Sequence, residues 1–552
     1  MPDQIRAMPS EKSMLYLLGL LILFGAASLA GPVMEPDAAL YASIAKNIVL
    51  RGDWINLFGN GGEWLDKPHL PFWLAAASFK IFGLSAFAYK LPSFLAGLLG
   101  LVYLYRLALH LYNRQTALLA AVIYFSSLHL ILCNYDVRAE VYLTAFSVGA
   151  LYHYFLARGE RWVWHIIAGS FMAALAVMTK GIFVLMPLFG GFILYWLLTG
   201  QWRSLFSARW WLAIALILAF ISPELYCLYR QFDMHPDKVV FGQTNVSGIR
   251  FFFWDSQFGR FFNNGPIKGK GDLSFFIHTT LWAFLPWSLI LFAAVWRDLR
   301  HIKRVLNAKA IIFLVAALTF IIFSLSKFQL PHYIILIFPQ LAILSSAYLG
   351  TLSPVALRSW RSIQAIICVL ACLLLAVIVF FFGVKGSGLF YILVVAAVSL
   401  IAWQGLRSAQ RGIVWSSVTF ALLFLIFVNF FFYPALLQYQ AGMQAARWSA
   451  VQGLKGRPVI YKQLMNAYAF EFYHPGLVDR AETPEALAEL QTDKPLLVYA
   501  DTESAAELEE RFGAVRLKAF KGYHITRLKP KFLNAATREG TLDSFVLLKI
   551  ER

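Results

Sequence analysis

Residues 363–383 read IQAIICVLACLLLAVIVFFFG and contain no charged side chain. A helix needs about 20 such residues to cross the hydrocarbon core of a bilayer. Comparable apolar runs occur at 14–33, 91–110, 115–133, 139–157, 162–179, 182–199, 210–229, 274–296, 310–326, 333–351, 387–405 and 412–434. The sequence therefore predicts a polytopic α-helical membrane protein with about 13 transmembrane helices.

Composition supports this class. Of the 552 residues, 59% are hydrophobic and only 14% are charged, whereas soluble domains carry about 45–50% apolar and about 25% charged residues. A soluble globular enzyme and a disordered protein are both excluded. The net charge of +18 comes almost entirely from residues 1–435, because residues 436–552 hold sixteen basic and fourteen acidic side chains. We therefore expect no nucleic-acid partner.

Loop charges predict the orientation. Alternate short loops carry several basic residues, and the loops between them carry one. The first set consists of Arg106, Arg114, Arg158, Arg161, Arg203, Arg209, Arg297, Arg300, Lys303, Arg304, Lys309, Arg358, Arg361, Arg407 and Arg411, with Arg6 and Lys12 at the N-terminus. By the positive-inside rule this set is cytoplasmic. Residues 1–435 then form a transmembrane domain with external loops at 34–90 and 230–273.

The external loop 34–90 contains an apolar stretch at 70–87. Pro71 and Lys80 interrupt it, so we expect a helix at the membrane interface, with a further span as the alternative.

Residues 436–552 are predicted to form a small external α/β domain. Strands are expected at 457–462, 495–501 and 545–550, and helices at 484–491 and 502–512. This alternation predicts a small parallel or mixed sheet covered by helices. The region contains no nucleophile elbow, phosphate-binding glycine loop or metal-ligand spacing.

Two carboxylates at the external ends of helices are candidates for chemistry. Asp37 begins an amphipathic pattern in EPDAALYASIAKNIVLRGDW, and Glu140 begins the span after CNYDVRAE. Ionisable groups near the bilayer are costly and usually face a cavity or a partner. The alternatives are a helix N-cap for Asp37 and, in the second loop, a local ion pair of Arg138 with a carboxylate, since Asp136, Arg138 and Glu140 lie within five residues.

Single cations surround these carboxylates on the same predicted face. They are Lys67, Lys180, Arg260 and Lys327. Most stand beside Pro or Gly at helix ends, and together they indicate a cavity that binds an anion such as phosphate. The alternative for each is contact with lipid headgroups. His69, His278 and His332 lack metal-ligand spacing and are expected to be hydrogen-bonding or interfacial histidines.

The order of these motifs resembles a known family. An Asp-bearing helix is followed by KPHLPFW, RAEVYLT, TKG, WDSQFGR and SLSKFQLPHY. This resembles the bacterial aminoarabinose transferases, which are protein-mannosyltransferase-like C-type membrane glycosyltransferases. The resemblance covers roughly residues 1–435. The chain differs from the family in having Ala38 after the first Asp, Glu140 for Asp, Asp66 for Glu and His69 for Pro.

The resemblance implies an enzyme at the outer face of the bacterial inner membrane, with a periplasmic C-terminal domain. Such enzymes transfer 4-amino-4-deoxy-L-arabinose from undecaprenyl phosphate to lipid A phosphates, which gives resistance to polymyxin. The matching motifs imply catalytic roles for Asp37 and Glu140. They further imply donor-phosphate contacts from Lys67, Lys180, Arg260 and Lys327, and substrate contacts from Tyr41, Arg138, Asp66, His69 and Tyr333.

Several alternatives stay open at this point. A hydroxyl acceptor on a protein or glycan would need a general base, whereas a lipid A phosphate is already an anionic nucleophile. A divalent metal held by Asp37 and Glu140 is possible, and no other cofactor is expected. A lipid transporter is the alternative of another class. We expect a monomer in contact with membrane lipid.

Overall fold

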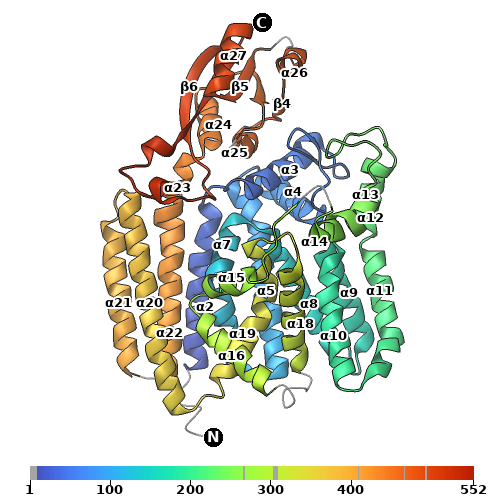
Figure 1. The fold of residues 1–552 in the computed structure, drawn as a ribbon, viewed down its shortest axis with the longest axis vertical. Helices are drawn as coiled ribbons and strands as arrows, with labels where there is room; N and C mark the ends of the chain where they lie inside the picture. Colours follow the sequence, from blue (N-terminus) through green and yellow to red (C-terminus); the bar gives the residue numbers. More distant parts are fainter. Residues whose placement is uncertain are drawn as a thin grey trace.

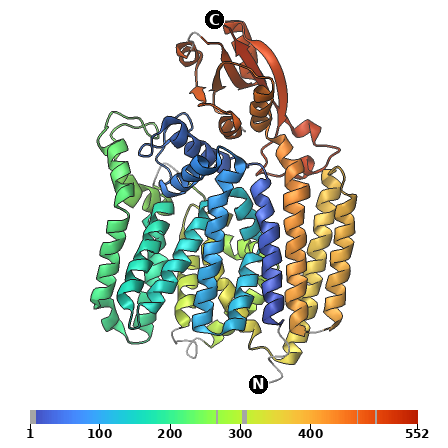
Figure 2. The same cartoon turned by 180° about the vertical axis from the view of Figure 1, so that it is seen from behind.

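The computed structural model describes residues 9–264, 268–301, 309–407, 409–464, 467–490 and 494–551. Arg6, Lys303 and Arg304, which support the predicted orientation, lie outside these ranges, as do residues 265–267 of the predicted loop 230–273. Long helices run side by side through one half of the molecule, and the C-terminal residues form a separate layer beyond one end of them (Figure 1). The view from behind shows the same two-layer arrangement (Figure 2).

Within the described ranges, seven helical segments are long and apolar enough to cross a membrane. They are Glu11–Ala30 (α2 with η1), Ala86–Leu111 (α5), Trp162–Lys180 (α9), Pro331–Leu349 (η6 with α19), Pro354–Phe382 (α20), Gly388–Gly405 (most of α21, Gly388–Arg407) and Arg411–Tyr439. The last of these runs from α22 (Ala409–Ile426) through η7 (Phe427–Phe432) and α23 (Tyr433–Leu436) to η8 (Leu437–Tyr439). The number rises to nine if each of two bent pairs is one span. The pairs are α6 (Arg114–Phe125) with α7 (Leu128–Asp136), and α11 (Ala208–Phe220) with α12 (Ser222–Leu228) and η4 (Tyr229–Asp233).

The other predicted runs are helical but shorter, broken or less apolar. They form α8 (Ala139–Leu156), η2 with α10 (Ile182–Leu198), α15 (Phe275–Ala283) with α16 (Ser288–Arg300), and α18 (Ala310–Leu325). The prediction of a helical membrane protein is confirmed, and the count of thirteen spans stays a prediction. The stretch at 70–87 forms α4 (Leu70–Phe82), whose 13 residues extend about 20 Å, less than the thickness of the bilayer core.

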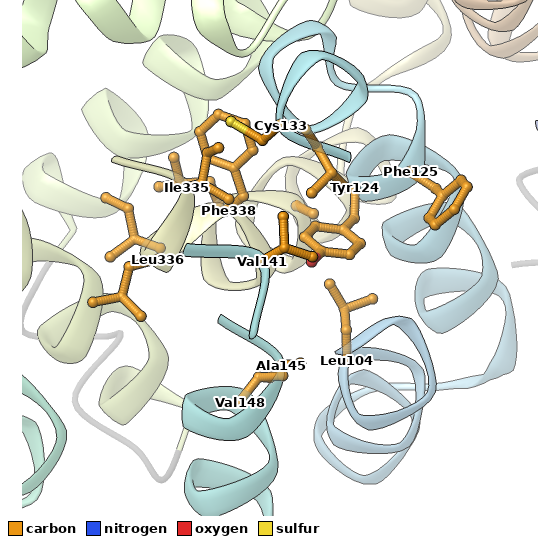
Figure 3. Close-up of a cluster of buried hydrophobic side chains, with 14 of the residues drawn as sticks. Leu104, Tyr124, Phe125, Cys133, Val141, Ala145, Val148, Ile335, Leu336 and Phe338 are labelled. Atoms are coloured by element: carbon orange, nitrogen blue, oxygen red, sulfur yellow. The ribbon is translucent and has the colours of Figure 1, made fainter. Parts of the chain in front are cut away.

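The helix α8 lies at the centre of the packed bundle. All but two of its residues are buried, and Val141, Ala145 and Val148 meet side chains from the neighbouring helices (Figure 3). Close approach requires small residues here: a side chain at Gly100 of α5 would lie 3.2 Å from the Cα atom of Ala145. Because other helices cover α8, it can carry a polar residue such as Glu140 near its start.

Local signals explain where the elements begin and end. The helix α20 follows Ser353, whose hydroxyl accepts a hydrogen bond from the Ala356 amide, and Pro354 takes the first helical position. It stops at Gly383, which has a φ of 66°. The external helix α3 (Asp37–Arg51) likewise ends at Gly52, with a φ of 72°.

The C-terminal residues contain a five-stranded mixed sheet of order β4-β3-β5-β7-β6. Its strands are β3 (Arg457–Tyr461), β4 (Asp479–Ala481), β5 (Leu496–Asp501), β6 (Val515–Gly522) and β7 (Asp543–Ile550). The strand β3 is parallel to β4 and β5, and β7 is antiparallel to β5 and β6. Helices α24 (Ala441–Val451), α25 (Ala467–Tyr473), α26 (Pro484–Glu489) and α27 (Thr502–Phe512) accompany the sheet. The sequence predictions missed β4, which is short, and β6, which is mostly exposed and strongly basic.

Packing between α10 and α18 gives a stability prediction. A methyl group at Gly191 of α10 would lie 2.2 Å from the Val315 Cγ2 atom and 3.1 Å from that residue's backbone. We expect Gly191→Ala to lower the free energy of unfolding by about 1–3 kcal/mol, because a tightly packed pair must separate. Gly19→Ala is the matched control, since nothing lies within 4 Å of its position. Thermal melting in detergent compares the variants, and equal melting temperatures would show that the two helices are less tightly packed.

Candidate functional site

The candidate site lies where residues 34–90 and 230–264 meet the end of the helix bundle that is nearest the C-terminal layer. Two adjoining cavities share a wall formed by Asp66, Lys67, Glu140, Lys180, Arg260, Phe328 and Tyr333. The larger encloses about 1020 Å³ including its open mouth, and most of its other lining residues are apolar. The smaller encloses about 600 Å³ and is also lined by Asp37, Tyr41, Arg138 and His332. The structure thus gathers nine of the eleven side chains singled out in the sequence.

Asp37 is the first residue of α3 but does not cap it. Pro36 occupies the N-cap position, and no side-chain hydrogen bond is made there. The carboxylate of Asp37 instead forms an ion pair with Arg138. The Arg138 guanidinium also contacts the Asp136 carboxylate at 2.5 Å. One cation therefore serves two carboxylates at this end of the smaller cavity.

Glu140 is buried in the first turn of α8 and pairs with Lys180 at the end of α9. The Nε2 atom of His332 lies 3.7 Å from its carboxylate. The expected alternative of a local pair between Arg138 and a carboxylate of this loop is met by Asp136, while Glu140 pairs with Lys180.

The conformation after Lys180 explains the glycine of the TKG motif. Gly181 has a φ of 101°, which favours glycine. A side chain there would collide with Gln257, whose amide donates a hydrogen bond to the Lys180 carbonyl at 3.2 Å. The glycine therefore allows η5 (Phe251–Gly259) to pack against the end of α9.

The charges around Asp66 have the opposite composition to those around Arg138, with two cations and one carboxylate. Asp66 accepts a hydrogen bond from Lys67 at 2.5 Å and pairs with Arg260. Burial alone would raise the pKa of Asp66, but the two cations outweigh it and the pKa lies below its usual value. Burial lowers the pKa of Lys67 despite its carboxylate neighbour. Two cations share one carboxylate here, so this end of the wall carries a surplus positive charge.

The two tyrosines of the predicted site line these cavities. The Tyr333 ring lies beneath Lys180, with the Nζ atom 3.7 Å from the ring centroid. Tyr41 lines the smaller cavity and packs edge-on against Phe72, with 5.5 Å between ring centroids. Both rings are aromatic surfaces beside the charged wall.

Lys327 does not take the place expected for a phosphate ligand. Its side chain is exposed, whereas its neighbours Ser326 and Phe328 line the larger cavity. Its backbone amide donates a hydrogen bond to the Phe261 carbonyl. The position of this lysine therefore gives no support to a contact with the donor phosphate.

His69 also differs from its expected substrate-binding place. It is buried, and its Nδ1 atom lies 3.0 Å from Glu224, while Nε2 lies 2.9 Å from the Ile55 carbonyl. Both ring nitrogens are therefore occupied within the protein, and the histidine holds the start of α4 beside Lys67. The sequence analysis missed Glu224, although a carboxylate inside the apolar run 210–229 is itself a signal.

The C-terminal region holds α3 through buried polar contacts. The Lys46 ammonium donates hydrogen bonds to the backbone carbonyls of Glu471 and, at 2.6 Å, His474. The Glu471 carboxylate in turn accepts from Arg480 at 3.3 Å. Burial lowers the pKa of Lys46 to about 8. These contacts position the helix that carries Asp37 and Tyr41, and sequence patterns alone gave no sign of them.

The carboxylates do not suit a divalent metal. Asp37 and Glu140 each have a cation as nearest charged partner, namely Arg138 and Lys180, and a metal ion would have to displace or repel it. Among the described residues, no group of three or more His, Cys, Asp or Glu side chains is placed to hold an ion. We derive no metal-dependent step.

The pair between His69 and Glu224 predicts a pH-dependent stability. Burial would lower the pKa of His69, but Glu224 outweighs it and the pKa is raised. The pair therefore stabilises the fold below the histidine's unfolded pKa of about 6.5, and this contribution is lost as pH rises through the folded value. Glu224→Gln should lower the melting temperature more at pH 5.5 than at pH 9. An equal loss at both values would contradict a protonated histidine, and Glu503→Gln on the exposed surface is the control.

Comparisons with known proteins agree with this geometry. Residues 66–227 match the family described as dolichyl-phosphate-mannose-protein mannosyltransferase. The undecaprenyl phosphate-alpha-4-amino-4-deoxy-L-arabinose arabinosyl transferase of Pseudomonas aeruginosa LESB58 is 27% identical over 321 residues, which are 56% of this chain and 54% of that protein. The Edwardsiella ictaluri transferase of the same name is 27% identical over 349 residues, or 60% and 59% of the two chains. The matched part thus spans little more than half of these relatives.

Solved structures share the fold over almost the whole chain. The crystal structure of ArnT from Cupriavidus metallidurans bound to undecaprenyl phosphate has a TM-score of 0.75 at 18% identity and covers 98% of both chains. The archaeal oligosaccharyltransferase AglB from Archaeoglobus fulgidus has a TM-score of 0.52 at 11% identity, covering 90% of this chain and 70% of that one. The resemblance to the aminoarabinose transferases is confirmed, and the chain has the helical membrane fold of the C-type glycosyltransferases.

Proposed function

We propose that this chain is an inner-membrane glycosyltransferase that moves 4-amino-4-deoxy-L-arabinose from undecaprenyl phosphate to a lipid A phosphate. The names of its relatives support the donor, and the motif resemblance described above implies lipid A phosphate as the acceptor. The observation that carries the proposal is the uneven charge around the smaller cavity, which Asp37, Asp66, Lys67, Arg138 and Arg260 all line. Two cations share Asp66 at one end, and two carboxylates share Arg138 at the other.

The positive end suits the donor phosphate. Lys67 and Arg260 border the larger, mainly apolar cavity, which provides room for the start of a polyprenyl chain. A guanidinium and an ammonium bind phosphate strongly. As the sugar leaves, negative charge grows on the donor phosphate, and fixed cations that stabilise such charge usually supply the largest catalytic contribution. Lys180 lies between this end and Glu140.

The negative end suits the amino sugar. Asp37 and Asp136 share Arg138, and of these two carboxylates Asp37 lines the smaller cavity, where it can meet the sugar's ammonium group. The acceptor phosphate oxygen attacks the anomeric carbon, a new C–O bond forms, and the bond to the donor phosphate oxygen breaks. Undecaprenyl phosphate leaves with the electron pair, no proton must be removed, and the anomeric centre is inverted.

A hydroxyl acceptor fits the site less well. It would need a carboxylate to remove a proton, yet Asp37 and Glu140 are both held in ion pairs. A transporter fits less well still, because transporter sites lie near the bilayer midplane, and these charges lie at helix ends. The paired carboxylates therefore favour a phosphate acceptor.

Arg260→Gln tests the donor-phosphate role. Loss of one fixed charge at the developing anion should reduce transfer by about 100-fold or more. Lipid A from cells that lack the gene, complemented with each variant, is analysed by mass spectrometry for the pentosamine addition. Lys327→Met is the matched control and should transfer like the wild type, because its side chain is exposed. Unmodified lipid A with the wild-type gene would move the assignment to hydroxyl acceptors.

We further propose thirteen spans, a cytoplasmic N-terminus and a periplasmic α/β domain at 436–552 in a monomeric protein. Single cysteines test this topology, because Cys133, Cys227, Cys368 and Cys372 are buried. A membrane-impermeant maleimide should label Glu503→Cys in intact spheroplasts. Gln201→Cys, in a predicted cytoplasmic loop, should react only after permeabilisation, and the reverse pattern would contradict the orientation.

A further inference from the structure

A second site candidate is an open groove between α24 and β6, at the base of the C-terminal region. It encloses about 1040 Å³ including open solvent. Three cations line it, Arg447, Lys518 and Lys521. Three aromatic side chains, Tyr439, Trp448 and Phe520, lie among them, with the amides of Gln438 and Gln444. Nothing in the proposed transfer reaction uses this groove.

The charge of the groove is largely uncompensated. Lys521 contacts Glu539 at 3.1 Å, and both side chains are more than half exposed. Lys518 lies 5.2 Å from the centroid of Trp448 and 5.6 Å from that of Phe520. Among the described residues no carboxylate lies within 4.0 Å of Arg447 or Lys518, so the groove presents positive charge beside the partly exposed rings of Tyr439 and Trp448, while Phe520 is buried.

The groove is attached to the outer end of the bundle. The hydroxyl of Tyr439, at its floor, accepts a hydrogen bond from Arg538 at 3.0 Å. The same guanidinium donates to the carbonyl of Phe382, the last residue of α20, at 2.6 Å. The segment after β6 lies over this end of α20 (Figure 1) and exposes Arg527, Lys529 and Lys531. A lipid whose chains stay in the membrane beside α20 can thus raise its headgroup into the groove.

We propose that this groove binds the phosphorylated saccharide headgroup of a glycolipid, as a docking site for the acceptor outside the catalytic cavities. Cations bind the phosphates, ring faces pack on sugar rings, and the two amides meet hydroxyl groups. A plain anionic phospholipid would use the cations alone. The proposal rests on the proposed function for the identity of the acceptor, but its binding test needs no donor.

Native mass spectrometry of the full chain in phosphatidylcholine nanodiscs tests the site. With bis-phosphorylated lipid A as the probe, we expect two bound molecules per wild-type chain, one in the catalytic cavities and one in the groove. Arg447→Gln with Lys518→Gln should retain only the first. Lys494→Gln with Arg511→Gln is the matched control, since it removes the same charges from exposed positions elsewhere.

The outcomes separate the two proposals. Equal stoichiometry in the two double variants would overturn the groove site, and so would phosphatidylglycerol that competes as well as lipid A. Competition by phosphatidylglycerol would show a general surface for anionic lipids. A wild-type stoichiometry of one bound lipid A would show that the lysines of β6 serve only to protect this edge strand from pairing. If binding is selective but no pentosamine is transferred, the groove stands and the proposed function fails.

Discussion

The ion pairing of charges at the outer ends of the helices is the constraint on which the rest of the site depends. A charge near the bilayer is tolerated only with a partner. Glu140 meets this condition through Lys180, which comes from the following helix. Asp37 meets it through Arg138, across the gap between an external helix and the bundle. Each pair therefore also fixes the position of one element against another.

Unequal pairing gives the site its direction. If every charge had one partner, both ends of the site would be neutral. Instead, Asp66 is shared by two cations, which leaves that end positive, and Arg138 is shared by two carboxylates, which leaves the other end negative. The positive end faces the apolar cavity. The external helix that carries Asp37 is held in turn by Lys46, whose ammonium is bound by carbonyls of the C-terminal region. That region thus contributes to the site without lining it.

Much of this was predictable from the sequence, for identifiable reasons. Apolar runs indicate transmembrane helices because the thickness of the bilayer sets their length. Isolated cations in the loops opposite the basic loops indicated the charged wall. The predicted roles of individual side chains failed where the role depends on a residue that is close in space but distant in the sequence. His69 contacts Glu224, which is far away in the chain, and Lys327 is exposed and lines neither cavity despite its motif. The edge strand β6 has too many exposed charges to show a buried-strand pattern.

The pairing also bears on the acceptor of the proposed transfer reaction. A carboxylate that acts as a base must be free to take up a proton, whereas Asp37 and Glu140 are each engaged by a cation. The nucleophile must then arrive already ionised, as a phosphate does. An anionic acceptor would in turn be repelled by unpaired carboxylates, so the same cations that engage them allow it to approach. The same arrangement of charges therefore pairs the carboxylates and favours an anionic acceptor.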